Sequence, residues 1–205
     1  MEISIMPVSP LNRRAFMAGT GGLTLTASGI LRNSAKAAVE EQGIEPFSKA
    51  MQPLARPLPV PTTTFQDVQG EDVSLSHWKG QAFLLHLWAT WCPPCIRELP
   101  DVDSAIHALG RNGPPIVAIN TLGGDVAMTQ AFYAAHHIGA LPIYIDLHGE
   151  LLKALGPLPG MEPGQKGIPR SYVVDAKGEM RAASLGLTAW DPRDVQQHFE
   201  TLTKS

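Results

Sequence analysis

The sequence predicts an α/β protein in which a central mixed sheet is flanked by helices and preceded by an N-terminal β-hairpin extension. Apolar strand patterns alternate with helical patterns between residues 82 and 202. Residues 82–88 are nearly all apolar, which is typical of a strand buried on both faces. With 205 residues, of which 44% are hydrophobic, the chain can form one domain with its own core and still carry a leader.

The first half of the expected domain begins near Thr62. Residues 63–68 and 73–75 have the pattern of a hairpin joined by a turn at 69–72, and strand 82–88 then leads directly to Cys92. The elements expected next are a helix over 96–109, a strand over 116–119, a helix over 126–137, a strand over 143–145 and a short helix over 151–155.

The second half of the expected domain ends in a hairpin and a helix. Residues 171–174 and 180–185 form the hairpin, with a turn at 176–178. The closing helix spans 191–202, because Asp191 is a suitable N-cap and Pro192 fits the first helical position. Alternating strands and helices place helices on both faces of the sheet.

Residues 1–37 have the features of an export leader. Arg13 and Arg14 lie in a stretch that resembles the twin-arginine export signal, and a weakly hydrophobic segment follows to Ile30. An A-x-A site at 35–37 would make Ala38 the mature N-terminus, and an uncleaved leader that anchors the protein in a membrane is the alternative. Either outcome predicts a location in the bacterial periplasm or outside the cell, where disulfides persist.

Residues 38–61 are rich in proline and are expected to form a linker or an arm, with residues 62–205 as the folded domain. Removal of the leader leaves 12 basic and 18 acidic residues, a net charge of −6. This balance disfavours nucleic acid or an anionic membrane surface as a partner.

The two cysteines of the chain, Cys92 and Cys95, are spaced as C-x-x-C. If they begin a helix, its free N–H groups and dipole stabilise a thiolate at Cys92. Pro93 and Pro94 fit such a first turn, where a missing N–H costs nothing. We therefore expect a redox disulfide in which Cys92 attacks a substrate disulfide and Cys95 resolves the mixed disulfide.

Two other uses of the cysteines are less well supported. A zinc site needs four ligands and there is no second cysteine pair in the sequence, so we expect no metal. A purely structural disulfide is also disfavoured, because closing so short a loop removes little entropy from the unfolded chain.

Two motifs in the right order resemble the TlpA/ResA group of exported thioredoxin-fold thiol-disulfide oxidoreductases. The first motif is Trp-Ala-Thr-Trp-Cys-Pro-Pro-Cys at 88–95, followed by Glu-Leu-Pro at 98–100. The second is Gly-Ile-Pro at 167–169 with Tyr-Val-Val-Asp after it, and a weaker likeness at 186–191 is closest to TlpA. The resemblance covers residues 62–203 and implies a thioredoxin-like fold and an enzyme that reduces protein disulfides.

The resemblance assigns Pro169 as a cis-proline that faces the disulfide. A cis bond there would present the backbone of Ile168 as an open edge with which a substrate strand can pair. Trp91 beside Cys92 is expected to shield the disulfide and to contact substrates, as are Pro93 and Pro94.

The resemblance also indicates an active-site acid at Glu98, which would carry protons to and from Cys95; a solvated glutamate is the alternative. His86 stands where thioredoxins usually have an acid. It is expected either to titrate near neutral pH and tune the thiolate or to be a hydrogen-bonded core residue. Arg170 would add a positive charge near the site, and the Pro/Gly-rich loop 156–166 either sets specificity or is an inert excursion.

The expected partners are proteins with disulfides or cysteine pairs, such as apocytochrome c or copper-centre assembly proteins, and a membrane thiol electron donor. We expect a monomer that needs no cofactor.

A dithiol oxidase stays open as an alternative function, because the reduction potentials of thioredoxin-like proteins span roughly 150 mV on one fold. A copper chaperone using Cys92, Cys95 and a histidine is an alternative of another class, although Sco-type chaperones have three residues between their cysteines. A peroxidase would need a threonine-rich motif, which does not precede Cys92.

Overall fold

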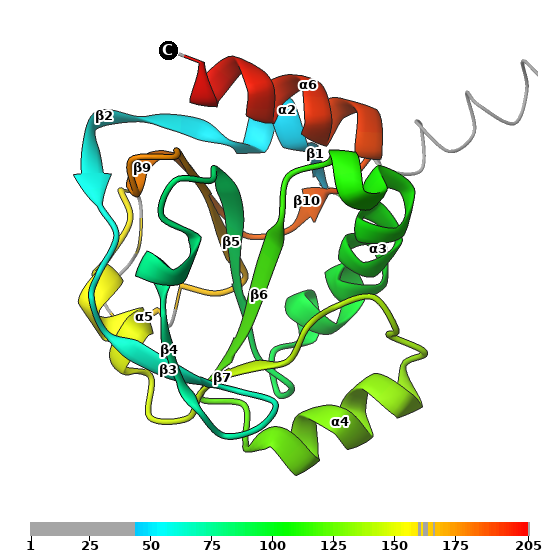
Figure 1. Ribbon diagram of the computed structural model, residues 1–205. Helices are drawn as coiled ribbons and strands as arrows, with labels where there is room; N and C mark the ends of the chain where they lie inside the picture. Colours follow the sequence, from blue (N-terminus) through cyan, green and yellow to red (C-terminus); the bar gives the residue numbers. More distant parts are fainter. Residues whose placement is uncertain (1–43, 160, 162–163, 166, 205) are drawn as a thin grey trace, which may run out of the picture.

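A computed structural model describes residues 44–159, 161, 164–165 and 167–204. An eight-stranded sheet forms its centre (Figure 1). The strands are β2 (Gln52–Pro59), β3 (Thr64–Asp67), β4 (Asp72–Ser74), β5 (Phe83–Trp88), β6 (Ile116–Thr121), β7 (Tyr144–Asp146), β8 (Arg170–Val174) and β9 (Glu179–Leu185). Their order is β2-β9-β8-β5-β6-β7-β3-β4, and the sheet is mixed because β5, β6 and β7 are parallel while the other pairs are antiparallel.

Five helices surround this sheet in the described part of the chain. They are α2 (Phe47–Ala50), α3 (Pro93–Leu109), α4 (Val126–Ala135), α5 (Glu150–Leu155) and α6 (Pro192–Thr203), with short 3-10 turns η1 (Leu75–Trp78) and η2 (Gly110–Asn112). None of the helices in these residues combines the length and the apolar character that a membrane span requires.

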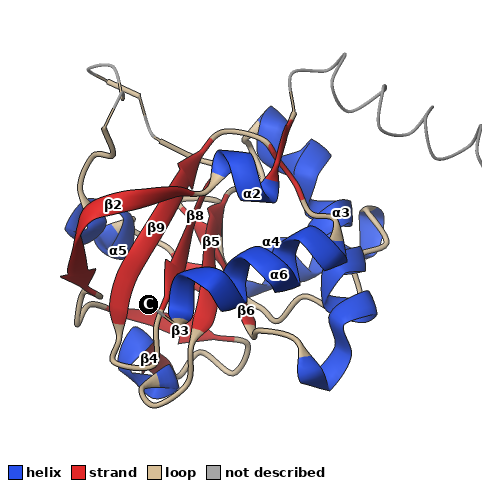
Figure 2. Ribbon diagram, turned by 90° about the horizontal axis from the view of Figure 1, so that it is seen from above, coloured by secondary structure: helices blue, strands red, loops and turns tan. Residues whose placement is uncertain are grey.

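Strand β5 divides the core into two layers, since all six of its residues are buried and successive side chains point to opposite faces. Leu84 and Trp88 pack with residues of α2, α3 and α6, whereas Leu85 and Leu87 pack with residues of α5 and η1. Figure 2 shows α3 and α6 on one side of the sheet and α5 on the other. The predicted α/β architecture with a mixed sheet and helices on both faces is confirmed.

Helix α6 begins as the sequence predicts. The Asp191 side chain accepts hydrogen bonds from the backbone N–H groups of Arg193 and Asp194, both at 3.0 Å, and Pro192 occupies the first helical position. The expected hairpins are also present: β3 pairs with β4 around a turn at Gly70, and β8 pairs with β9.

Residues 44–61, the described part of the 38–61 segment, form an N-terminal arm that pairs with the sheet. It forms β1 (Glu45–Pro46), α2 and β2, and β1 pairs with a two-residue strand, β10 (Thr188–Ala189). The folded unit therefore begins before Thr62, because β2 pairs with β9 as the edge strand of the sheet. The expected leader at 1–37 lies outside the described residues.

Candidate active site

The two cysteines form a disulfide at the start of α3. Cys92 is the N-cap residue, and its Sγ accepts a hydrogen bond from the Cys95 N–H at 3.3 Å. Pro93 and Pro94 occupy the first helical turn, as predicted. Cys92 is 3% exposed and Cys95 fully buried, so an approaching thiol meets Cys92 first.

A cis peptide bond joins Ile168 to Pro169 next to the disulfide. The Sγ of Cys92 lies 3.8 Å from the carbonyl oxygen of Ile168, which places residues 76 positions apart in contact. The Pro169 carbonyl in turn accepts a hydrogen bond from the N–H of Gly186 at 2.9 Å. The structure thus brings together the C-x-x-C pair and the cis-proline loop that the sequence singled out separately.

Trp91 is 43% exposed beside the disulfide. Its indole Nε1 donates to the Leu122 carbonyl at 2.7 Å, and the hydroxyl of Thr90 donates to the Gly123 carbonyl at 2.6 Å. A Cβ on Gly123 would lie 2.9 Å from the Thr90 backbone nitrogen, so only glycine permits this approach. Sequence reasoning did not identify this loop, whose only signal is the adjacent pair Gly123-Gly124.

Glu98 is 3% exposed and lies one helical turn after Cys95, with both side chains buried under the same helix. Its Oε1 accepts hydrogen bonds from Trp190 Nε1 at 2.6 Å and from the Thr188 N–H at 3.2 Å, while its Oε2 has no hydrogen-bond partner among the described residues. Burial raises the pKa of Glu98 to about 8. The alternative of a solvated glutamate is therefore wrong.

His86 is fully buried on β5. Its Nδ1 is 2.9 Å from the hydroxyl of Ser171, and its ring meets Trp190 edge to face with centroids 5.4 Å apart. Burial lowers the pKa of His86 to about 3, so the imidazole is neutral at neutral pH. Of the two expectations for His86, these contacts favour a hydrogen-bonded core residue, because burial disfavours the charged imidazole.

Trp190 connects these two groups, since it contacts His86 and donates to Glu98. Sequence reasoning did not assign it a role. The one feature of the sequence that could have indicated a role is the resemblance of residues 186–191 to TlpA, because this segment includes Thr188 and Trp190.

Arg170 is 2% exposed and has a different arrangement from the one expected. Its Nε donates to the Gly167 carbonyl and its Nη1 to the Gly156 carbonyl, both at 2.7 Å, and Nη1 also lies 3.0 Å from the Tyr172 hydroxyl. Tyr172 belongs to the core layer on the far side of the sheet from Cys95. The guanidinium therefore binds the residues at the two ends of the loop, Gly156 and Gly167. It is directed towards these carbonyls and not towards the thiols.

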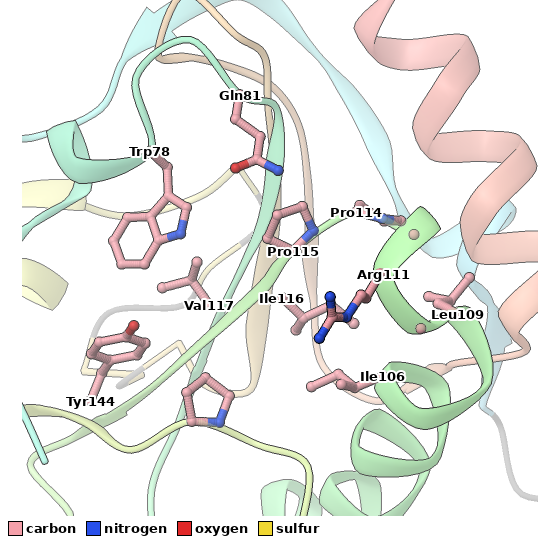
Figure 3. A pocket seen from close by; sticks show the side chains of 13 residues that line it. Trp78, Gln81, Ile106, Leu109, Arg111, Pro114, Pro115, Ile116, Val117 and Tyr144 are labelled. Carbon is pink, nitrogen blue, oxygen red and sulfur yellow. The ribbon is translucent and has the colours of Figure 1, made fainter.

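A pocket of about 300 Å³ lies at the other end of α3 from the cysteines. Trp78, Tyr144, Pro115, Ile106 and Arg111 are among the side chains that surround it (Figure 3). It contains none of the candidate site residues. Within the described ranges, no three His, Cys, Asp or Glu side chains are grouped as metal ligands.

Comparisons with known proteins show the family and the fold of this chain. A family model described as the AhpC/TSA family matches residues 58–183. The chain is 31% identical over 121 residues to the sporulation thiol-disulfide oxidoreductase A of Bacillus subtilis, an alignment that covers 58% of this chain and 67% of that protein. It is 26% identical over 142 residues to the thiol-disulfide oxidoreductase ResA of Geobacillus thermodenitrificans, covering 69% and 75% of the two chains.

A solved structure is similar over most of its length. The thiol:disulfide interchange protein of Chlorobium tepidum, a thioredoxin family protein, superimposes with a TM-score of 0.56 at 28% identity, covering 71% of this chain and 99% of that one. The comparison supports a thioredoxin-like fold around the C-x-x-C pair.

Proposed function

Because the chain belongs to the AhpC/TSA family and is a thiol-disulfide oxidoreductase of the ResA-like kind with the pair Cys92 and Cys95, we propose that it is an exported reductase of protein disulfides. One observation carries the proposal: the disulfide at the start of α3 faces the cis Ile168–Pro169 bond, with Cys92 Sγ 3.8 Å from the Ile168 carbonyl. This arrangement leaves one sulfur beside an edge of backbone on which a substrate segment can lie.

Cys92 is the nucleophile in this proposal. In the reduced protein its thiolate is stabilised by the helix N-terminus, where the Cys95 N–H already points at Sγ from 3.3 Å. The thiolate attacks one sulfur of a substrate disulfide, forms a new S–S bond to it and releases the other substrate sulfur as a thiolate.

Cys95 resolves the mixed disulfide. Its thiol loses a proton and attacks Cys92 Sγ, which re-forms the Cys92–Cys95 disulfide and releases the second substrate sulfur. The substrate disulfide gains two electrons and two protons and becomes a dithiol, while the enzyme dithiol becomes a disulfide. A dithiol donor in the membrane then reduces the enzyme again.

Glu98 is proposed as the group that receives the proton of Cys95. It lies one turn along the same helix, it is buried as that thiol is, and its pKa of about 8 allows it to gain and lose a proton near neutral pH. Its Oε2, for which the described part of the chain offers no hydrogen-bond partner, is the oxygen available for that proton.

Substrates are proposed to bind around Cys92. Ile168 and cis Pro169 offer backbone on one side, and the exposed indole of Trp91 offers apolar contact area on the other. Pro93 is exposed at the same helix end and Pro94 partly so. His86 is too deeply buried to touch a substrate and is assigned to the packing around Trp190.

The location and the substrates follow from the resemblance to the TlpA/ResA group. The twin-arginine-like leader supports export to the periplasm, either cleaved after residue 37 or retained as an anchor. Proposed substrates are apocytochrome c or copper-centre assembly proteins.

Trapping tests this function. In Cys95→Ser the mixed disulfide on Cys92 cannot be resolved, so substrate proteins expressed in the same periplasm are expected to remain attached through a reducible bond. Attached proteins would be identified by mass spectrometry after release with a reductant. The matched control is Cys92→Ser, and equal capture by the two variants would overturn the proposal.

A further inference from the structure

The N-terminal arm lies against the segment that binds Glu98. Strand β1 pairs in parallel with β10, with Glu45 opposite Thr188 and Pro46 opposite Ala189. The N–H of Ser48 donates to the Asp194 carboxylate at 3.0 Å, which fixes α2 beside α6 (Figure 1).

Phe47 is the aromatic residue by which the arm enters the core. It is fully buried, its ring meets Trp190 edge to face at 5.5 Å, and it also contacts His198 at 6.2 Å. Trp190 in turn donates through Nε1 to Glu98 at 2.6 Å. One ring therefore separates Phe47 from the buried carboxyl.

Both donors to Glu98 thus belong to the segment that the arm covers. Thr188 is in β10, which β1 pairs with directly, and Trp190 is held by Phe47. Without the arm, β10 would lose its paired strand in the described part of the chain, and the indole of Trp190 would lose an aromatic neighbour.

We infer that residues 44–51 are part of the redox site, and that Phe47 is a positioning residue that holds Trp190 over Glu98 and keeps water away from the carboxyl. The meaning of this inference for catalysis rests on the proposed role of Glu98 as proton carrier. The geometry itself does not depend on which substrate the enzyme reduces.

Several titratable groups lie on the elements packed around Glu98. Asp101 on α3 raises the pKa of Glu98 slightly further by its charge, after burial as the main cause. His86 on β5 is neutral at the pH of interest, and Asp194 on α6 is engaged with Ser48. The same elements also carry Glu45 and Lys49 on the arm, His198 on α6, which contacts Phe47, and further charged side chains, namely Arg97, Asp103 and His107 on α3 and Arg193 and Glu200 on α6.

Burial therefore dominates the titration of Glu98, and a smaller side chain at position 47 should admit water beside it. Truncation of Phe47 is expected to lower the pH midpoint of the Glu98 titration, because a solvated carboxylate is more stable than a buried one. The two hydrogen bonds to Oε1 act in the opposite direction but are smaller contributions.

The experiment follows the Glu98 carboxyl carbon by carbon-13 NMR in the oxidised protein between pH 4 and 10, with the signal assigned by its absence from Glu98→Gln. A midpoint near 8 is expected for the unmodified chain. In Phe47→Ala the midpoint should fall by about one unit or more. Phe47→Leu keeps most of the apolar volume and should give a smaller fall, which keeps the test open if the alanine variant fails to fold.

Met51→Ala is the matched control. Met51 is 1% exposed and belongs to the same arm and the same core layer, but it has no ring to pack on Trp190. Its truncation should destabilise the protein and leave the Glu98 midpoint in place. An unchanged or raised midpoint in the Phe47 variants, or an equal fall in Met51→Ala, would overturn the inference. Because the oxidised protein is measured without substrate, this result is independent of the trapping experiment.

Discussion

At the scale of single residues, the site depends on a carboxyl group that the fold keeps out of water. Glu98 is 3% exposed, and its two donors, Trp190 and Thr188, both bind the same oxygen. A carboxyl in such a place holds its proton at a higher pH than usual. This is the basis for the proposal that Glu98 exchanges a proton with Cys95 near neutral pH, which a solvated glutamate would not do.

The proton on Glu98 makes stability depend on pH. Burial raises its pKa from 4.5 to about 8, so the folded protein keeps a proton that the unfolded chain releases. This contribution is complete below pH 4.5 and is lost as the pH rises towards about 8, at up to about 1.4 kcal/mol per pH unit. Glu98→Gln should remove this slope, as measured by urea unfolding of the oxidised protein.

His86 determines the pH range in which the contribution of Glu98 to stability can be measured without a contribution from His86. Burial lowers its pKa from 6.5 to about 3, so its contribution to stability is present above pH 6.5 and is lost as the pH falls. The two slopes oppose each other between pH 4.5 and 6.5, and only that of Glu98 remains between 6.5 and 8. If the free energy of unfolding of the wild type and of Glu98→Gln changed with pH in parallel between pH 6.5 and 8, Glu98 would not hold a proton in the folded protein.

At the scale of elements, the cis-proline loop is held by one buried side chain. Arg170 donates to the carbonyls of Gly156 and Gly167 at 2.7 Å each. Gly167 directly precedes Ile168, whose carbonyl lies 3.8 Å from Cys92 Sγ. Arg170 therefore links Gly156, Gly167 and the proposed substrate edge into one hydrogen-bonded unit.

Arg170→Lys should loosen this unit. Lysine keeps the charge but lacks the planar fork that reaches several acceptors, so we expect a loss of about 2–3 kcal/mol in the free energy of unfolding. The protein substrate should also show a higher KM, because the edge that binds it is less ordered.

Arg181→Lys on β9 is a suitable comparison. The side chain of Arg181 is 22% exposed and lies 3.8 Å from the Asp175 carboxylate, so this change should cost less than about 1 kcal/mol. Urea unfolding and steady-state kinetics measure both variants. Equal losses for the two arginines would show that Arg170 has no special part in holding the loop.

Elements with a clear periodicity could be predicted from the sequence. Strand β5 and helix α6 lie within one residue of the expected bounds, and helix α3 begins three residues earlier than expected, because buried runs and N-cap signals are local. Strand β2 could not be predicted. Its prolines and its mostly exposed side chains give no alternation, and only its pairing with β9 makes it a strand.

The site shows the same division between local and distant signals. Cys92, Cys95 and Pro169 follow from spacing and from family resemblance. The contacts of Phe47 and Trp190 with each other and with Glu98 join positions far apart in the chain, so no local pattern announces them. The lowered pKa of His86 could not be predicted from the sequence either, because it depends on the residues that bury the ring from all sides.

At the scale of the whole molecule, the sheet and α3 present one disulfide at an end of the domain, and the arm and the C-terminal segment close over the acid behind it. The pocket at the opposite end of α3 takes no part in this arrangement. The fold is shared by enzymes that reduce disulfides and by enzymes that form them, and the direction is set by the reduction potential.

The reduction potential of the Cys92–Cys95 pair is therefore the most direct test of the central claim. It would be measured by equilibrating the protein in glutathione buffers of known potential and quantifying the free thiols. A reductase requires a value near that of thioredoxin or glutaredoxin, between about −270 and −200 mV. A value near about −120 mV, that of a strong oxidant, would contradict the account and identify the protein as a dithiol oxidase.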